Sequence, residues 1–174
     1  MDNCIIVSRY NEDLSWLKSF RDFKIFIYNK GQKYDINITK DLYTLPNVGR
    51  ESHTWLYHIV NNYNNLSKVN IFLQGRIDDL GCMAYQNPNN YLLDIERSGF
   101  CASRYGLLGP FHWKYNVGIE NDIRYKEDWE NGKITKSSIG FRKFAKNLFP
   151  EIPIFVATSY GGCFAVKKNK IMQH

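Results

Sequence analysis

Short apolar-rich runs alternate with helical patterns in the first half of the chain. Residues 4–7, 24–28 and 69–73 are rich in β-branched or aromatic side chains and show little polar alternation, which is typical of strands buried on both faces of a parallel sheet. Apolar residues at helical spacing mark residues 14–20 and 53–63. Strands that alternate with helices predict an α/β fold with a mostly parallel sheet flanked by helices.

The second half is less regular, and its pattern predicts short elements around a long loop. Residues 105–135 combine glycine, proline and mixed charge, so we expect a loop there with one short helix over 120–129. The chain ends where a helix beginning at Lys168 is expected to continue, which predicts a truncated C-terminus. No repeat or linker divides the sequence, so a single α/β domain over residues 1–174 is predicted. The other expected elements are a loop or edge strand over 32–46, helices over 91–95 and 141–148, strands over 100–104 and 152–157, and a turn into a last strand over 160–166.

Polar residues follow the predicted strands at the point where each strand ends. They are residues 8–12, 29–30 and 74–79, and in open parallel sheets ligands bind outside these carboxyl ends. Residues 47–51 begin the intervening helix, where free N–H groups and the Arg50 side chain suit an anion. We therefore expect these four stretches to meet at one edge of the sheet and form a binding site.

Several common catalytic motifs are absent from the sequence. It contains neither G-x-x-x-x-G-K-[ST] nor a G-x-G-x-x-G after the first strand, which argues against P-loop ATPases and ordinary dinucleotide enzymes. It also lacks the G-x-S-x-G of acyl hydrolases and the H-E-x-x-H of zinc proteases. His58 is expected on a helix surface or partly packed, whereas His53, near Arg50, is open between packing and a ligand role.

The net charge of +6 favours an anionic partner such as nucleic acid, anionic lipid or a phosphorylated small molecule. The excess is dispersed, and its densest run, at residues 167–170, is short. Such a distribution is more typical of a solvated surface than of a nucleic-acid footprint. A basic nucleic-acid-binding module, which an aromatic content of 16% also suits, therefore stays an alternative rather than the main hypothesis.

Cysteine usage and the absence of targeting signals predict a compartment. Cys4, Cys82, Cys101 and Cys163 are widely spaced and form no C-x-x-C pair, which predicts free thiols in a reducing environment. The N-terminus lacks the basic region of a signal peptide, and no apolar run approaches the ~20 residues that span a bilayer. We expect a cytoplasmic protein without a membrane span.

A resemblance to a known family is carried by five stretches of sequence. They resemble nucleotide-sugar-dependent glycosyltransferases of the GT-A fold, and more closely a family of single-domain proteins of large DNA viruses, bacteria and fungi associated with that activity. The resemblance covers residues 4–79 well and 159–171 moderately. The stretches are CIIVSRYNEDLSWL, IYNKG, LPNVGRESHTWLYHIVNNYNNL, IFLQG and YGGCFAVKKNKI.

The resemblance implies a GT-A-like, Rossmann-like fold that binds a nucleoside-diphosphate sugar donor. It implies transfer of the sugar to a glycan, protein or small-molecule acceptor, in the host cytoplasm if the protein is viral. The residues that it implies are Ser8, Arg9, Tyr10 and Asn11 at the base and ribose, Asn29 at the nucleoside, Asn47, Arg50 and Arg76 at the diphosphate, and Gly161 and Gly162 at the floor of the acceptor site.

Two adjacent carboxylates, Asp78 and Asp79, lie near the place where GT-A enzymes carry an Asp-x-Asp motif. The resemblance implies that they hold Mn²⁺ or Mg²⁺, which would neutralise the leaving diphosphate, with Asp79 acting in catalysis. The pair is adjacent and a few residues late, and Arg76 is able to replace part of the cation's charge. A catalytically inactive sugar-binding domain is therefore a further alternative.

An inverting transferase also needs a general base near the acceptor hydroxyl. Asp128 is the candidate for this role, with Asp122, Glu127 and Glu130 as alternatives that the sequence does not separate.

Overall fold

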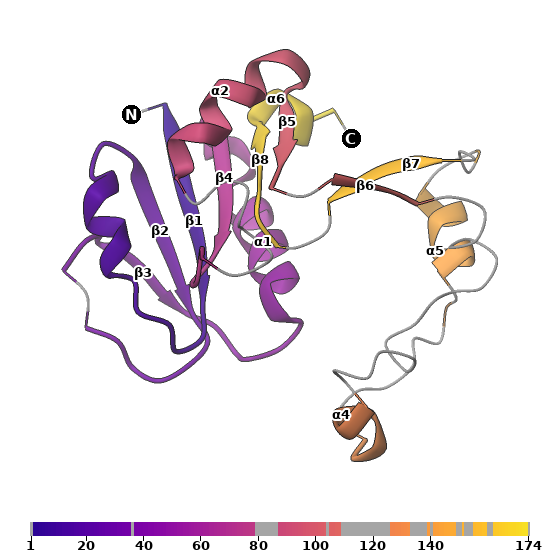
Figure 1. The fold of residues 1–174 in the computed structure, drawn as a ribbon, viewed down its shortest axis with the longest axis horizontal. Coiled ribbons are helices and arrows are strands. Elements are labelled where there is room, and N and C mark those ends of the chain that lie inside the picture. The colour runs from indigo at the N-terminus through magenta and orange to yellow at the C-terminus, as the bar shows by residue number, and fades with distance from the viewer. Residues whose placement is uncertain are drawn as a thin grey trace. The chain divides into compact units, whose positions relative to one another are not determined.

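The computed structural model shows an α/β arrangement with a six-stranded mixed sheet (Figure 1). It describes residues 2–35, 37–78, 87–103, 105–108, 126–132, 139, 141–148, 151, 155–159 and 162–173. The strands are β1 Asn3–Arg9, β2 Lys24–Asn29, β3 Asp41–Thr44, β4 Val69–Gln74, β5 Phe100–Ala102, β6 Tyr105–Leu108, β7 Val156–Ser159 and β8 Phe164–Lys167. The α-helices are α1 Arg50–Asn61, α2 Pro88–Ser98, α4 Lys126–Glu130, α5 Phe141–Leu148 and α6 Lys168–Ile171, and the 3₁₀ helices are η1 Ser15–Phe20 and η2 Tyr63–Asn65.

The six-stranded sheet has the order β3-β2-β1-β4-β8-β5. The first four strands are parallel, whereas β8 runs antiparallel to β4 and to β5. The α/β prediction is thus confirmed, but the mostly parallel sheet is only half right. The antiparallel β8 was not expected, because a strand's direction depends on where the chain re-enters the sheet and not on its own apolar pattern.

Both faces of the sheet are buried, which explains why its strands have continuous apolar runs. On one face, Ile5 and Val7 pack with Leu17 of η1 and Ile95 of α2. On the other face, a second apolar cluster includes Trp55 of α1. Because successive strand residues point to opposite faces, each run contributes to both clusters.

Helix α2 shows local sequence signals that set its limits. Asn87 accepts a hydrogen bond from the Asn89 N–H at 2.9 Å, and Pro88 occupies the first turn. Gly99 ends the helix with φ of 74°, and its N–H donates to the Ile95 carbonyl. These are the favoured caps at each end of a helix. The predicted helix over 91–95 is therefore confirmed, and its caps extend it in both directions.

The chain divides into two compact units, residues 1–105 with 159–174, and residues 106–158. Helix α5 spans the predicted residues 141–148. Strand β6, which pairs with β7, occupies residues where a loop was predicted. Its Tyr-Gly-Leu-Leu sequence has no polar alternation and was too short to separate from the surrounding loop residues. The single domain over 1–174 stays a prediction.

Two observations bear on the predicted compartment. Among the helices of the described residues, none has the length and apolar character needed to cross a membrane. Cys4 and Cys101 are free and buried, but Cys163 is disulfide-bonded. The expectation of four free thiols is therefore wrong for Cys163. Spacing along the sequence carries no information about which sulfurs meet in the fold. Disulfides are typical of oxidising compartments, so this bond does not favour a cytoplasmic location. That location stays a prediction.

The disulfide predicts a definite count of reactive thiols. Burial raises the pKa of both Cys4 and Cys101 to about 11, so neither thiolate is available in the folded protein at neutral pH. We expect iodoacetamide to label no cysteine rapidly in the folded protein, two after unfolding without reductant, and four after reduction, as counted by intact-mass spectrometry. Four labels without reductant would contradict the bond.

Candidate functional site

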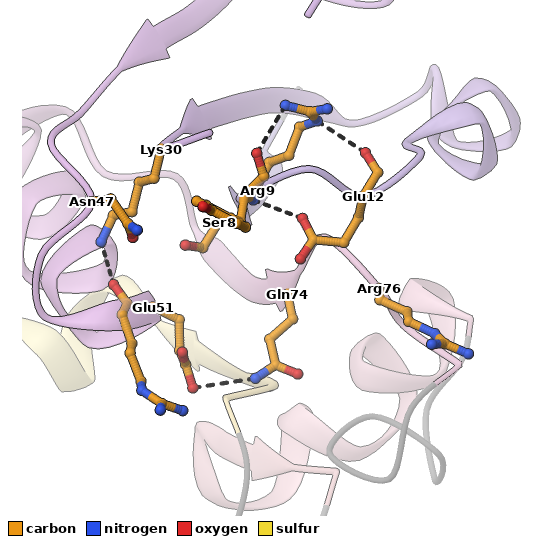
Figure 2. A pocket seen from close by; sticks show the side chains of 10 residues that line it. Ser8, Arg9, Glu12, Lys30, Asn47, Glu51, Gln74 and Arg76 are labelled. Carbon is orange, nitrogen blue, oxygen red and sulfur yellow. Dashed lines mark hydrogen bonds between the residues drawn. The ribbon is translucent and has the colours of Figure 1, made fainter. Parts of the chain in front are cut away.

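A cavity of about 380 Å³ lies at the carboxyl edge of the parallel strands (Figure 2). This size falls in the range of small-molecule sites. Ser8 and Arg9 come from the end of β1, Lys30 follows β2, and Gln74 ends β4. The predicted convergence of strand ends and the helix start is therefore confirmed. The lining residues are Ser8, Arg9, Tyr10, Glu12, Lys30, Asn47, Arg50, Glu51, Gln74 and Arg76.

Strand register explains why these residues meet. Ser8 of β1 lies opposite Gln74 of β4, and Arg9 lies opposite Asn29 of β2. The Gly75 N–H donates to the Ser8 carbonyl at 2.8 Å, which continues the β1–β4 pairing one residue beyond the strand. A parallel sheet thus brings residues far apart in sequence to one edge.

A larger hollow of about 630 Å³ lies at the opposite end of β2 and β3. It is lined by Arg21, Lys24 and Lys40 among others. It belongs to the amino ends of these strands, where parallel sheets do not usually bind ligands. The smaller cavity is therefore the stronger candidate, because it lies at the expected carboxyl edge of the sheet.

The turn that leads into α1 has an unusual backbone. Gly49 has φ of 60° and Arg50 has φ of 48°. Among the described residues, Arg50 is the one non-glycine residue with positive φ. A Cβ on Gly49 would lie 2.9 Å from the Cβ of His53, so glycine fits the close approach as well as the dihedral angle. A non-glycine residue held in this conformation is a recognised sign of a functional site.

Lys30, which lines the cavity, contacts this turn through its side chain. Its Nζ donates to the Val48 carbonyl at 2.8 Å and also to the Arg50 carbonyl. The side chain is buried, and burial lowers the Lys30 pKa, while the nearby Glu51 carboxylate opposes this effect. No side chain of the described residues caps the first turn of α1. Positive charge and helix N–H groups therefore gather at one side of the cavity.

Two carboxylates also line the cavity. Glu12 accepts a hydrogen bond from the Tyr10 N–H at 2.7 Å, and Glu51 accepts one from Gln74 Nε2 at 3.2 Å. Figure 2 shows the Glu51 carboxylate hydrogen-bonded to the side chain of Gln74. Gln74 Oε1 is buried and has no partner within the part of the chain that the structure describes. A hydroxyl of a ligand would satisfy such an acceptor.

Two glycines leave room for these carboxylates. A Cβ on Gly75 would lie 2.5 Å from Glu12 Oε2. A Cβ on Gly162 would lie 2.9 Å from both Gln74 Nε2 and Glu51 Cγ. Gly162, a predicted site residue that precedes β8, is buried beside Gln74 and Glu51. Gly161 lies outside the described residues.

Arg9 was predicted to contact the donor, but its guanidinium hydrogen-bonds to other residues of the chain. It donates to Asn29 Oδ1 at 2.7 Å and to the carbonyls of Glu12, Tyr10 and Gln32 at 2.9, 3.2 and 3.1 Å. Figure 2 shows its guanidinium pointing away from the hollow. The predicted residue Asn29 is buried and also donates to the Gln32 carbonyl at 2.9 Å.

Of the other predicted nucleoside and diphosphate residues in this region, Ser8 is partly buried, whereas Tyr10, Asn11, Asn47 and Arg50 are exposed. Tyr10 and Asn47 line the cavity. Asn11 is not among the lining residues, and its Oδ1 accepts a hydrogen bond from the Gln32 N–H at 2.9 Å. The structure thus brings Ser8, Tyr10, Asn47 and Arg50 together at the cavity and places Asn11 in the adjoining loop.

Arg76 and Asp78 form an ion pair, with 2.7 Å between Arg76 Nε and Asp78 Oδ1. Their side chains are 67% and 63% exposed, and Arg76 lines the cavity whereas Asp78 does not. The hydrogen bond from Arg76 lowers the pKa of the Asp78 carboxyl. Asp79 lies outside the described residues.

The described residues do not by themselves fit a divalent cation. They contain no group of three metal-ligating side chains. Mg²⁺ beside phosphates needs as few as one or two carboxylates, but Glu12 and Glu51 already accept hydrogen bonds from the chain and Asp78 from Arg76. A Mn²⁺ or Mg²⁺ site therefore stays a prediction that depends on Asp79. Asp128, the predicted base, lies on α4 in the second unit.

Four lining residues, Glu12, Lys30, Glu51 and Gln74, were not assigned a role from the sequence. Their positions carried information, since each lies in the polar stretch after a predicted strand or at the start of a predicted helix. Residue type alone did not distinguish them from polar turn residues.

Comparison with known proteins identifies one family. Residues 4–174 match a family model described as "Protein of unknown function (DUF3431)". No curated protein and no solved structure matches the chain.

Proposed function

We propose that this chain, which belongs to the DUF3431 family, is a glycosyltransferase whose cavity at the strand ends binds a nucleoside-diphosphate sugar. The observation that supports it best is the gathering of positive groups on one side of that cavity. Lys30 and Arg50 meet there with the first turn of α1, which no side chain in the described part of the chain caps. A diphosphate is the group that this combination suits best.

Other groups that line the cavity suit a polyol. Hydrogen-bond acceptors are provided by Glu12, Glu51 and Ser8. Gln74 Oε1 is a further, buried acceptor, and in this proposal the ligand donates a hydrogen bond to it. The carboxylates of Glu12 and Glu51 accept hydrogen bonds from hydroxyl groups and repel phosphate oxygens. A ligand with an anionic centre and hydroxyl-bearing ends, such as a nucleotide sugar, combines both requirements.

The proposed reaction breaks the bond between the anomeric carbon and the β-phosphate oxygen. An acceptor oxygen forms the new bond to that carbon and loses its proton, and the diphosphate leaves with the bonding electron pair. Charge develops on the leaving oxygen, where Arg50 and Arg76 stabilise it. A general base at the acceptor hydroxyl would take this proton in an inverting transfer, and Asp79 with Mn²⁺ or Mg²⁺ would add charge neutralisation.

A thermal-shift panel tests the donor site. The panel contains UDP, GDP, the corresponding nucleotide sugars and the free sugars, each with and without Mn²⁺. A ligand at about 100 times its Kd adds about 2.7 kcal/mol, so we expect the preferred nucleotide to raise Tm by roughly 5–10 °C. Arg50→Ala should reduce this shift strongly. Arg21→Ala, in the other hollow, should leave it unchanged and is the matched control.

The panel also distinguishes the alternatives. An inactive sugar-binding domain would be supported if a nucleotide raised Tm but no nucleoside diphosphate were released in the presence of acceptor sugars. The Arg76–Asp78 pair also favours this alternative. No shift with any nucleotide or nucleotide sugar would overturn the proposal.

A further inference from the structure

We propose that Lys30 is a positioning residue that holds the left-handed turn at Gly49 and Arg50 and thereby sets where the Arg50 guanidinium meets an anion. The identity of that anion as a diphosphate rests on the proposed function, whereas the role of Lys30 in the turn does not. The geometry that supports the role is the pair of hydrogen bonds from Lys30 Nζ to the carbonyls of Val48 and Arg50.

Two backbone hydrogen bonds contribute to the turn. The Val48 N–H donates to the Pro46 carbonyl at 2.9 Å, and the His53 N–H donates to the Gly49 carbonyl at 3.1 Å. Arg50, at φ of 48°, has a side chain that makes this conformation unfavourable. A strained residue persists only where its surroundings fix it, and the bonds from Lys30 reach the carbonyls on both sides of Gly49.

Lys30 is not placed where a cation stabilises a helix. It lies at the positive end of the α1 dipole, which disfavours a cation, and burial lowers its pKa. Its own backbone is fixed, since the Lys30 N–H donates to the Arg9 carbonyl at 2.8 Å. The side chain therefore reaches from a rigid strand end to the turn. This arrangement is unfavourable for the helix alone but useful for orienting a charged residue at the cavity.

The consequence concerns Arg50. The direction in which a side chain leaves the backbone depends on φ, so a fixed left-handed φ determines the starting direction of the Arg50 side chain. Arg50 is exposed and lines the cavity. Loss of the Lys30 contacts would allow residues 48–50 to relax and would move the guanidinium away from its binding position.

Binding measurements separate positioning from simple charge. UDP affinity is measured by calorimetry for the wild type, Lys30→Met, Lys30→Arg, Arg50→Ala and the double variant Lys30→Met/Arg50→Ala, with Lys33→Met as the control at an exposed loop lysine. We expect Lys30→Met to weaken binding at least tenfold when Arg50 is present and less than threefold when it is absent. Lys30→Arg, which keeps the charge but changes the geometry, should also weaken binding. The proposal would be overturned if Lys30→Met reduced UDP affinity equally in the presence and absence of Arg50, or if Lys30→Arg kept wild-type affinity.

A second measurement needs no ligand. Glycine adopts positive φ readily, so a turn carrying Arg50→Gly should not need Lys30. We expect Lys30→Met or Lys30→Arg to lower Tm by several degrees in the Arg50 protein and by clearly less in the Arg50→Gly protein. Additive effects on Tm would overturn the positioning role. If UDP fails to bind the wild type while this coupling is present, the proposed function fails and the role of Lys30 stands.

Discussion

Replacing Arg9 with methionine is expected to lower the free energy of unfolding by about 3 kcal/mol, comparable to breaking a buried ion pair. Arg9 is 4% exposed and donates to Asn29 Oδ1 and to three backbone carbonyls. Its guanidinium also lies 3.9 Å from the ring centre of Tyr34. Met fills most of the aliphatic volume but supplies none of these donors, so the buried Asn29 loses its charged partner.

The structural reason is that Arg9 joins the loops around the cavity. It connects residues 10–12 after β1 to residues 29–32 after β2. We expect Arg9→Met to lower Tm by roughly 10 °C and to shift the urea midpoint without changing the slope of the transition. UDP affinity at a temperature where the variant is folded should fall less than it does for Arg50→Ala.

Arg76→Met is the matched control for Arg9→Met. Arg76 also lines the cavity, but its side chain is 67% exposed in its pair with Asp78. Exposed pairs contribute at most about 1 kcal/mol, so its unfolding free energy should change little. If Arg9→Met were as stable as Arg76→Met and lost UDP binding instead, the Arg9 guanidinium would be a ligand group rather than a structural one.

The sequence predicted the location of the candidate site because the location follows from the order of elements. Continuous apolar runs indicated strands buried on both faces, and polar residues after each run marked the carboxyl edge. Ser8, Gln74 and Lys30 meet there because the register of β1 with its two neighbours places them there. Nothing finer than an α/β mixed sheet is shown by the fold, and the GT-A assignment remains part of the proposal.

The orientation of side chains at the site could not be predicted in the same way. Arg9 and Arg50 are both arginines at polar segment ends, yet Arg9 is buried among carbonyls while Arg50 is exposed at the cavity. No periodicity distinguishes them, because the difference comes from loops that close around Arg9. The sequence does not predict the left-handed φ of Arg50 either, since glycine and asparagine favour such conformations and arginine does not.

The burial of His58, on the same helix as Arg50, could not be predicted from the sequence either. It was expected on the helix surface or partly packed, but it is 1% exposed, so a surface position is wrong. His58 Nδ1 and the Tyr28 hydroxyl are hydrogen-bonded at 2.9 Å, and the imidazole packs edge-on to Phe26 with ring centres 4.7 Å apart. A polar residue at a core position is recognised only when its buried partner, here on β2, is known.

Acid is therefore expected to destabilise the protein through His58. Burial lowers its pKa from 6.5 to about 4, with a smaller contribution from the Lys24 charge. Below pH 6.5 the unfolded chain takes up a proton that the folded imidazole does not accept until about pH 4. Stability from this group is thus complete above pH 6.5 and is lost as pH falls toward 4. Each tenfold difference in proton affinity corresponds to about 1.4 kcal/mol, which gives a loss of about 3 kcal/mol.

Two variants identify the cause of this pH dependence when urea unfolding is measured between pH 7 and pH 4. His58→Gln keeps a polar group near Tyr28 but does not titrate, so its curve should be flatter over this range. Tyr28→Phe removes the hydrogen bond but leaves the imidazole buried, so the loss should persist at lower overall stability. An unchanged slope in His58→Gln would assign the pH dependence to other groups. Because α1 carries His58 near one end and Arg50 at the other, protonation that loosens this helix should also weaken UDP binding.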